Sequence, residues 1–172
     1  MLKDLHTLTP YLDFIRACNA DPDYRDPMLL TEQQLRRNLL DAPENPHTRV
    51  FGTFEGEAIM GVFALLVLED ERYLELLAGL SRSAASYDEL LAHLHSAYPG
   101  YQADFVYNPR NRLLQAALEA LSAEFDPEQQ KLVLRRAGPY VPDARVVPYR
   151  PEYRAQYLAL HTGDRYWTGE RV

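Results

Sequence analysis

Basic residues are scarce in this sequence of 172 residues, where 18 Lys and Arg stand against 25 Asp and Glu and give a net charge of -7. Proteins that bind nucleic acids need clustered Lys and Arg to contact the phosphates. Because no basic run occurs anywhere in the sequence, we expect no nucleic-acid partner.

Cysteine and long apolar runs are also rare. Cys18 is the only cysteine, which excludes an intrachain disulfide and a cysteine metal cluster, and we expect it to be a small buried side chain on a helix. The longest apolar run is Ala58 to Leu68, whereas a membrane span needs about 20 residues. The first ten residues lack the apolar core of a signal peptide. We therefore expect a cytoplasmic protein with no membrane partner.

Histidines are few and scattered. His93 and His95 are two residues apart on a predicted helix, so they point to different faces and cannot hold one metal ion together. We predict no metal site.

An apolar hairpin occupies the middle of the sequence, with strands predicted near 49–54 and 58–68. Glu55, Gly56 and Glu57 supply the turn, and Gly56 is the residue expected to have a positive φ. The second strand is apolar on both faces, which is typical of a central strand covered by helices on both sides. Gly61 within it predicts a bulge or a close approach of the backbone.

The remaining elements follow from helical stripes, caps and turn residues. Helices are predicted after Thr9-Pro10, after a capping box from Thr31 to Gln34, after a second box from Ser86 to Glu89, and after Asn108-Pro109 as N-cap and first helical residue. Further strands are predicted at 73–78, 101–107 and 130–136. This order predicts an α/β protein with a mixed sheet and helices on both of its faces.

The C-terminal part differs in character. Residues 137–148 contain three prolines and are interpreted as a linker between a domain at 1–136 and a segment at 149–172. The stretch TPYLDFIRACNAD (9–21) is weakly similar to RPEYRAQYLALHTGD (150–164). Our hypothesis is that residues 149–172 begin a second, truncated copy of the first domain, and that its aromatic residues form an interface with the first domain or with a second copy of the chain.

Three stretches resemble the GCN5-related N-acetyltransferase (GNAT) family, and specifically the N-terminal domain of a tandem two-domain member. They are VFGTFEGEAIMGVFAL, RYLELLAGLS and ADFVYNPRNRLLQAALEALSAEFD. The resemblance covers residues 1–136, and the segment after the linker is similar to the start of a second such domain.

The resemblance implies acetyl-CoA-dependent transfer of an acetyl group to the amine of a small molecule or peptide. It places acetyl-CoA between the fourth and fifth strands, which separate at one end. The residues that it implies for coenzyme binding are Leu76, Leu77, Ala78, Arg82, Ser83, Ser86, Asn108 and Asn111. It implies Glu75 as the base, with Glu69 and Glu71 as alternatives, and Tyr107 as the acid that protonates the leaving thiolate, with Tyr87 as an alternative.

Two alternatives remain open. Ser81 to Tyr87 contains no glycine, although the family's phosphate loop is glycine-rich, so this segment is interpreted as a non-catalytic domain or as a structural module that binds no coenzyme A. The sequence AGLSRSA (78–84) partly matches a hydrolase nucleophile elbow with Ser81 as nucleophile, but a polar loop that caps a helix explains it better.

Overall fold

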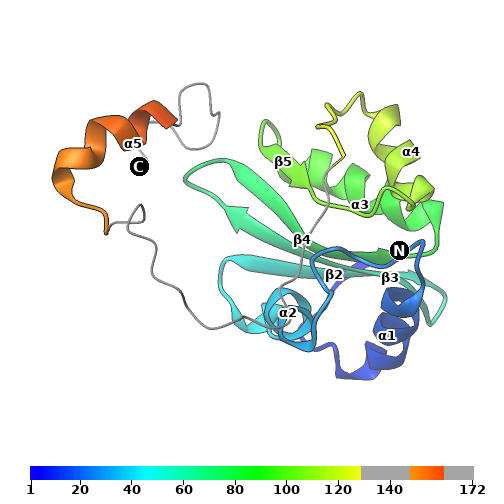
Figure 1. Ribbon diagram of the computed structural model, residues 1–172. Coiled ribbons are helices and arrows are strands. Elements are labelled where there is room, and N and C mark those ends of the chain that lie inside the picture. Colours follow the sequence, from blue (N-terminus) through cyan, green and yellow to red (C-terminus); the bar gives the residue numbers. More distant parts are fainter. Residues whose placement is uncertain (129–147, 161–172) are drawn as a thin grey trace. The chain divides into compact units, whose positions relative to one another are not determined.

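The computed structural model describes residues 1–128 and 148–160 (Figure 1). The chain divides into two compact units, Met1–Lys131 and Leu132–Val172. Within the described ranges, no helix combines the length and the apolar character needed to cross a membrane.

The first unit is built on a five-stranded mixed sheet with the strand order β1-β2-β3-β4-β5. Neighbouring strands from β1 to β4 are antiparallel, whereas β4 and β5 are parallel. The strands are β1 (Leu2–Asp4), β2 (Thr48–Glu55), β3 (Ala58–Leu68), β4 (Tyr73–Ser81) and β5 (Gln102–Phe105). The predicted α/β architecture with a mixed sheet is confirmed.

Helices cover both faces of this sheet (Figure 1). One face carries α1 (Leu12–Ala20) and α2 (Glu32–Leu35), which continues into a π-helical turn (Arg36–Leu40) and a 3-10 turn (Ala42–Glu44). The other face carries α3 (Ala84–Ala97) and α4 (Arg112–Ala120).

The central strand β3 is apolar because both of its faces are buried. Val62 and Ala64 pack with α1 and α2, while Phe63 and Leu65 pack with α3 and α4. All four side chains are at most 1% exposed. Burial on both faces removes the usual alternation of apolar and polar residues, so the prediction from the apolar run is confirmed.

Glycines shape the β2–β3 hairpin at two points. Gly56 has φ of +60°, as predicted for the turn. The register shifts from Thr53↔Gly61 to Phe54↔Ile59, so a bulge lies beside Gly61. A Cβ on Gly61 would lie 2.7 Å from the Thr53 Oγ1 atom. Both expected features, the bulge and the close approach, are therefore present.

Helix starts were predicted with mixed success. The capping box of Thr31 and Gln34 is formed. The box at Ser86 is wrong, because α3 begins at Ala84 and Ser86 is buried inside it, where its Oγ accepts a hydrogen bond from Thr53 at 2.8 Å. The cap at Asn108 is also wrong, because Asn111 caps α4 by accepting from the Leu114 N–H at 3.2 Å.

The described part of the second unit contains the 3-10 turn Pro151–Tyr153 and the helix α5 (Arg154–Leu160). The start of the chain repeats this order, with a proline-containing 3-10 turn (Thr9–Tyr11) leading into α1. The predicted strand 130–136, the prolines Pro139 and Pro142, and the aromatic residues Tyr166 and Trp167 lie outside the described residues.

Candidate functional site

The parallel strands β4 and β5 pair over only part of their length. Their register runs from Tyr73↔Gln102 to Leu76↔Phe105, where β5 ends and β4 continues to Ser81. The register of β4 against β3 skips Leu77, which marks a bulge at the point of separation. The edge of β4 from Leu77 to Ser81, called here the free edge, is therefore not covered by β5. A separation of these two strands at one end is what the family resemblance implies.

A buried carboxylate occupies this free edge. The Gly79 N–H donates to Asp26 Oδ2 at 2.7 Å, and the Met28 N–H donates to Asp26 Oδ1 at 2.6 Å. Asp26 is 4% exposed, although it belongs to the loop between α1 and α2. Hydrogen bonds to a carboxylate are stronger than neutral ones, so Asp26 anchors its loop to β4.

A tyrosine hydroxyl binds a second backbone group of the free edge. The Tyr87 hydroxyl donates to the Ser81 carbonyl oxygen at 3.1 Å and accepts from Asn111 Nδ2 at 2.8 Å. Burial raises the pKa of Tyr87, so the phenol is neutral and can donate this hydrogen bond. Side chains of the protein therefore hydrogen-bond to the Gly79 N–H and to the Ser81 carbonyl.

The loop that carries Asp26 also contacts the β5 side of the separation. Asn108, which follows β5, donates through Nδ2 to the Pro22 carbonyl oxygen at 2.8 Å. Arg82, which follows β4, lies 3.2 Å from Asp21 Oδ2. One short segment of chain is thus tied to residues that follow both strands.

Three residues predicted for coenzyme binding, which lie in or next to the loop after β4, make contacts within the chain. Arg82 donates to the Ala17 carbonyl oxygen at 2.8 Å in addition to its ion pair with Asp21. Ser83 precedes α3 without a side-chain cap, and its N–H donates to Ser81 Oγ at 3.0 Å. Ser86 lies inside α3. Together with the lack of glycine, these contacts do not fit a pyrophosphate cradle.

The predicted base and acid lie on different faces of the sheet. Leu76 packs with α3 and α4, so its neighbour Glu75 points to the opposite face, whereas Tyr107 packs on the α3/α4 face. Burial raises the pKa of Glu75, and the negative charge of Asp104, its neighbour on β5, raises it further. Burial also raises the pKa of Tyr107. The structure does not bring the two side chains together.

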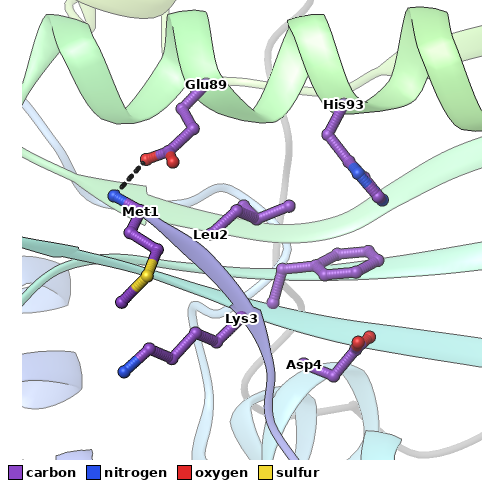
Figure 2. A pocket seen from close by; sticks show the side chains of 7 residues that line it. Met1, Leu2, Lys3, Asp4, Glu89 and His93 are labelled. Carbon is purple, nitrogen blue, oxygen red and sulfur yellow. Dashed lines mark hydrogen bonds and ion pairs between the residues drawn. The ribbon is translucent and has the colours of Figure 1, made fainter.

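A separate pocket of about 390 Å³ lies between β1 and α3 (Figure 2). On one side of the pocket, the N-terminal amine of Met1 donates hydrogen bonds to Glu89 Oε2 at 2.9 Å and to the Phe54 carbonyl oxygen at 2.9 Å. None of the residues predicted for catalysis or coenzyme binding lines it. The lining residues are Met1, Leu2, Lys3, Asp4, Phe51, Glu89 and His93.

Sequence reasoning missed the loop between α1 and α2. Asp21-Pro22 and Asp26-Pro27 have the composition of helix breaks, and neither is among the residues predicted for the site. The local sequence does not indicate that Asp26 is buried, because an Asp followed by proline is typical of an exposed turn. Within residues 1–128 and 148–160, no group of three or more His, Cys, Asp or Glu side chains could hold a metal ion.

No family model matches the chain, and no curated protein matches it. Two crystal structures of TTHA1254 from Thermus thermophilus are similar to it over part of its length. A point mutant is 26% identical over 57% of this chain and 76% of that one. The wild type is 19% identical over 56% and 76%. Both have a TM-score of 0.42, which is too low to support a conclusion on fold or function.

Proposed function

We propose that this chain belongs to a cytoplasmic GCN5-related N-acetyltransferase-like protein and that its first unit is a non-catalytic domain. In this proposal the first unit has the strand arrangement of the acetyltransferases but does not itself bind acetyl-CoA. The 3-10 turn Pro151–Tyr153 and the helix α5 repeat the order of the turn Thr9–Tyr11 and α1 in the first unit. This repeat supports a tandem arrangement in which another domain carries out the transfer.

One observation carries the proposal: two side chains of the chain itself hydrogen-bond to backbone groups of the free edge of β4. An extended ligand lying beside β4 would need the Gly79 N–H, which donates to Asp26 at 2.7 Å. It would also meet the Ser81 carbonyl, which accepts from Tyr87 at 3.1 Å. A buried, charge-assisted hydrogen bond is costly to replace, so the contacts of Asp26 and Tyr87 oppose coenzyme binding.

Titration of the 172-residue chain with acetyl-CoA, followed by calorimetry and thermal unfolding, tests this function. A ligand present at 100 times its dissociation constant stabilises a protein by about 2.7 kcal/mol. We expect neither saturable heat nor a shift of the melting temperature at about 1 mM acetyl-CoA. A dissociation constant near 10 µM, which would give about that stabilisation, would contradict the non-catalytic assignment.

The variant Arg82→Ala sharpens this test. Arg82 is the cation that the family resemblance places on the pyrophosphate, but its guanidinium pairs with Asp21 in the structure. If residual binding of acetyl-CoA is found and this variant removes it, Arg82 holds the phosphate and the domain is a coenzyme-binding one. Equal behaviour of the variant and the wild type supports the proposal.

The second candidate function is acetyl transfer by this domain itself, and the raised pKa of Glu75 favours it. Burial and the Asp104 charge make Glu75 a better proton acceptor than an ordinary carboxylate. Acetylation of an amine that depends on acetyl-CoA and is lost in Glu75→Gln would establish this function. Release of free thiol from acetyl-CoA measures the reaction.

A further inference from the structure

The strand β1 lies at the edge of the described sheet, where β2 is its neighbour on one side. Leu5, which follows β1, donates through its N–H to the Val50 carbonyl oxygen on β2 at 2.8 Å. Backbone groups of an antiparallel strand face its neighbour at every second residue. The N–H and C=O groups of Leu2 and Asp4 therefore face away from β2, and they have no partner in the described part of the chain.

A pocket lies beside this strand, between β1 and α3. Its volume is about 390 Å³, and Glu89 and His93 project into it from α3 (Figure 2). The apolar part of its lining comes from Leu2 and from Phe51 on β2. An unpaired strand edge beside a pocket for side chains is the geometry in which an extended peptide adds a further strand to a sheet.

We propose that β1 is a docking site for an extended peptide of another protein, which pairs antiparallel with the outer edge of β1 and places one side chain in the pocket. This surface is independent of coenzyme binding, because β1 and β5 form opposite edges of the sheet. Charged residues on an edge strand discourage indiscriminate pairing. Since Lys3 and Asp4 are both exposed, the peptide must match their charges.

The side chains of β1 define the chemistry of the peptide. Lys3 points toward Phe54, with Nζ at 5.0 Å from the centroid of its ring, whereas Leu2 packs on the α3 face. Asp4 lies on the same face as Leu2 and has no ion pair within the described residues. Side chains directly opposite in an antiparallel pair share a face. The matching peptide therefore has a basic residue opposite Asp4, an acidic residue opposite Lys3 and an apolar residue opposite Leu2, in that order.

A second copy of the chain fits this edge poorly. Two-fold antiparallel pairing over the whole of β1 (Leu2–Asp4) is centred on Lys3, so it brings the lysines of the two copies directly opposite each other. Like charges in this position destabilise a strand pair. A peptide with the complementary order of charges avoids this repulsion, which favours a separate partner over self-association.

The experiment titrates the full chain with a blocked peptide whose central residues are lysine, glutamate and leucine. Amide NMR and hydrogen exchange report on β1. We expect saturable binding that slows exchange of the Asp4 amide about tenfold, because this amide gains a hydrogen bond, while the Lys3 amide, which already faces β2, changes little.

Backbone methylation of the peptide provides a matched pair of probes. The lysine N–H of the bound peptide faces β1, whereas the glutamate N–H points away from it. Methylation of the lysine nitrogen should therefore weaken binding by about tenfold, because it removes a hydrogen bond and adds bulk at the edge. Methylation of the glutamate nitrogen should leave the affinity nearly unchanged.

Exchange of the two charges on β1 tests the order of the peptide's residues. The double variant Lys3→Glu, Asp4→Lys should bind the first peptide more weakly, by up to about fivefold for each mismatched pair. It should prefer a peptide with the central order glutamate, lysine, leucine. The control variant Asp13→Lys, Arg16→Glu exchanges two exposed charges on α1 and should bind like the wild type.

Three results would overturn the docking site. They are the absence of saturable binding by the wild type, equal weakening by the two methylated peptides, and an unchanged preference in the charge-exchanged variant. A dimer that forms with increasing concentration and protects the Asp4 amide, followed by sedimentation and hydrogen exchange, would also overturn it and assign the edge to a second copy. Each of these results leaves the proposed function standing, because acetyl-CoA binding is measured separately.

Discussion

The side chains of Tyr87 and Asn111 meet inside the first unit, where Asn111 Nδ2 donates to the Tyr87 hydroxyl at 2.8 Å. Asn111 also caps α4, and Tyr87 lies on α3 with 0% of its surface exposed. The Tyr87 hydroxyl in turn donates a hydrogen bond to the Ser81 carbonyl at the end of β4. One phenol therefore links the two helices of this face to the free edge of the sheet.

Tyr87→Phe should destabilise the protein by about 1 to 3 kcal/mol, because it leaves the buried Ser81 carbonyl and the Asn111 amide without this partner. Urea unfolding, followed by circular dichroism, measures the loss. Tyr11→Phe is the matched control, since no hydrogen bond of the Tyr11 hydroxyl is formed within residues 1–128 and 148–160. Equal stability of Tyr87→Phe and the wild type would show that water replaces the phenol.

Thr53→Val and Ser86→Ala should each cost about 1 to 3 kcal/mol, because each leaves one buried hydroxyl without its partner at 2.8 Å. The double variant should cost less than the sum of the two, because both hydroxyls are then absent. A double-mutant cycle from urea unfolding measures the coupling. Thr7→Ala, which breaks an exposed contact between hydroxyls, is the control. Additive costs in the double variant would contradict this pairing.

Gly61→Ala should destabilise the hairpin by about 1 to 3 kcal/mol, because a Cβ at this position lies 2.7 Å from Thr53 Oγ1 and 2.9 Å from the Phe63 ring. The melting temperature of the variant measures the effect. Gly61→Ala combined with Thr53→Ser should show the same loss, since the Ser hydroxyl can occupy the same place. A neutral Gly61→Ala would mean that the bulge relaxes.

Glu75→Gln should stabilise the protein at neutral pH but not in acid. The folded pKa of Glu75 lies above its ordinary value of 4.5, so folding favours the protonated form. This contribution is fully present below pH 4.5 and is lost as the pH rises through the folded pKa. Urea midpoints measured from pH 4.5 up to about pH 8 should therefore diverge between the variant and the wild type. Glu57→Gln, at the exposed turn of the β2–β3 hairpin, is the surface control.

Cys18 should react with thiol reagents only when the protein opens. Its side chain is 1% exposed, and burial raises its pKa to about 11, so the reactive thiolate is scarce at neutral pH. We expect slow labelling in native buffer and rapid labelling in urea, monitored with a chromogenic disulfide. Rapid labelling of the native protein would contradict the burial of this helix face.

Sequence reasoning predicted the strands better than the helix starts, and the reason is physical. Residues 58–68 are apolar over their whole length, and burial on both faces determines that pattern locally. The position of a helix cap depends on which of several nearby polar side chains accepts a hydrogen bond from a backbone N–H of the first turn. Ser86 looked like a cap from its spacing to Glu89, but Thr53 on a distant strand binds its hydroxyl and α3 begins two residues earlier.

The candidate site was predictable only in outline. The family resemblance implies that the fourth and fifth strands separate at one end, but it does not indicate which side chain occupies the free edge. Asp26 reaches Gly79 across 53 residues of sequence, and no local pattern encodes a contact of that separation. For the same reason, Arg82 was expected to bind the coenzyme, whereas in the structure its guanidinium forms an ion pair with Asp21.

The apolar character of β3 also affects how the chain must be made. During synthesis β3 leaves the ribosome before α3 and α4, which later cover one of its faces. Until those helices emerge, a long β-prone surface faces water, and such surfaces are prone to associate with one another. β3 therefore stays exposed to association with other chains until α3 and α4 have been synthesised.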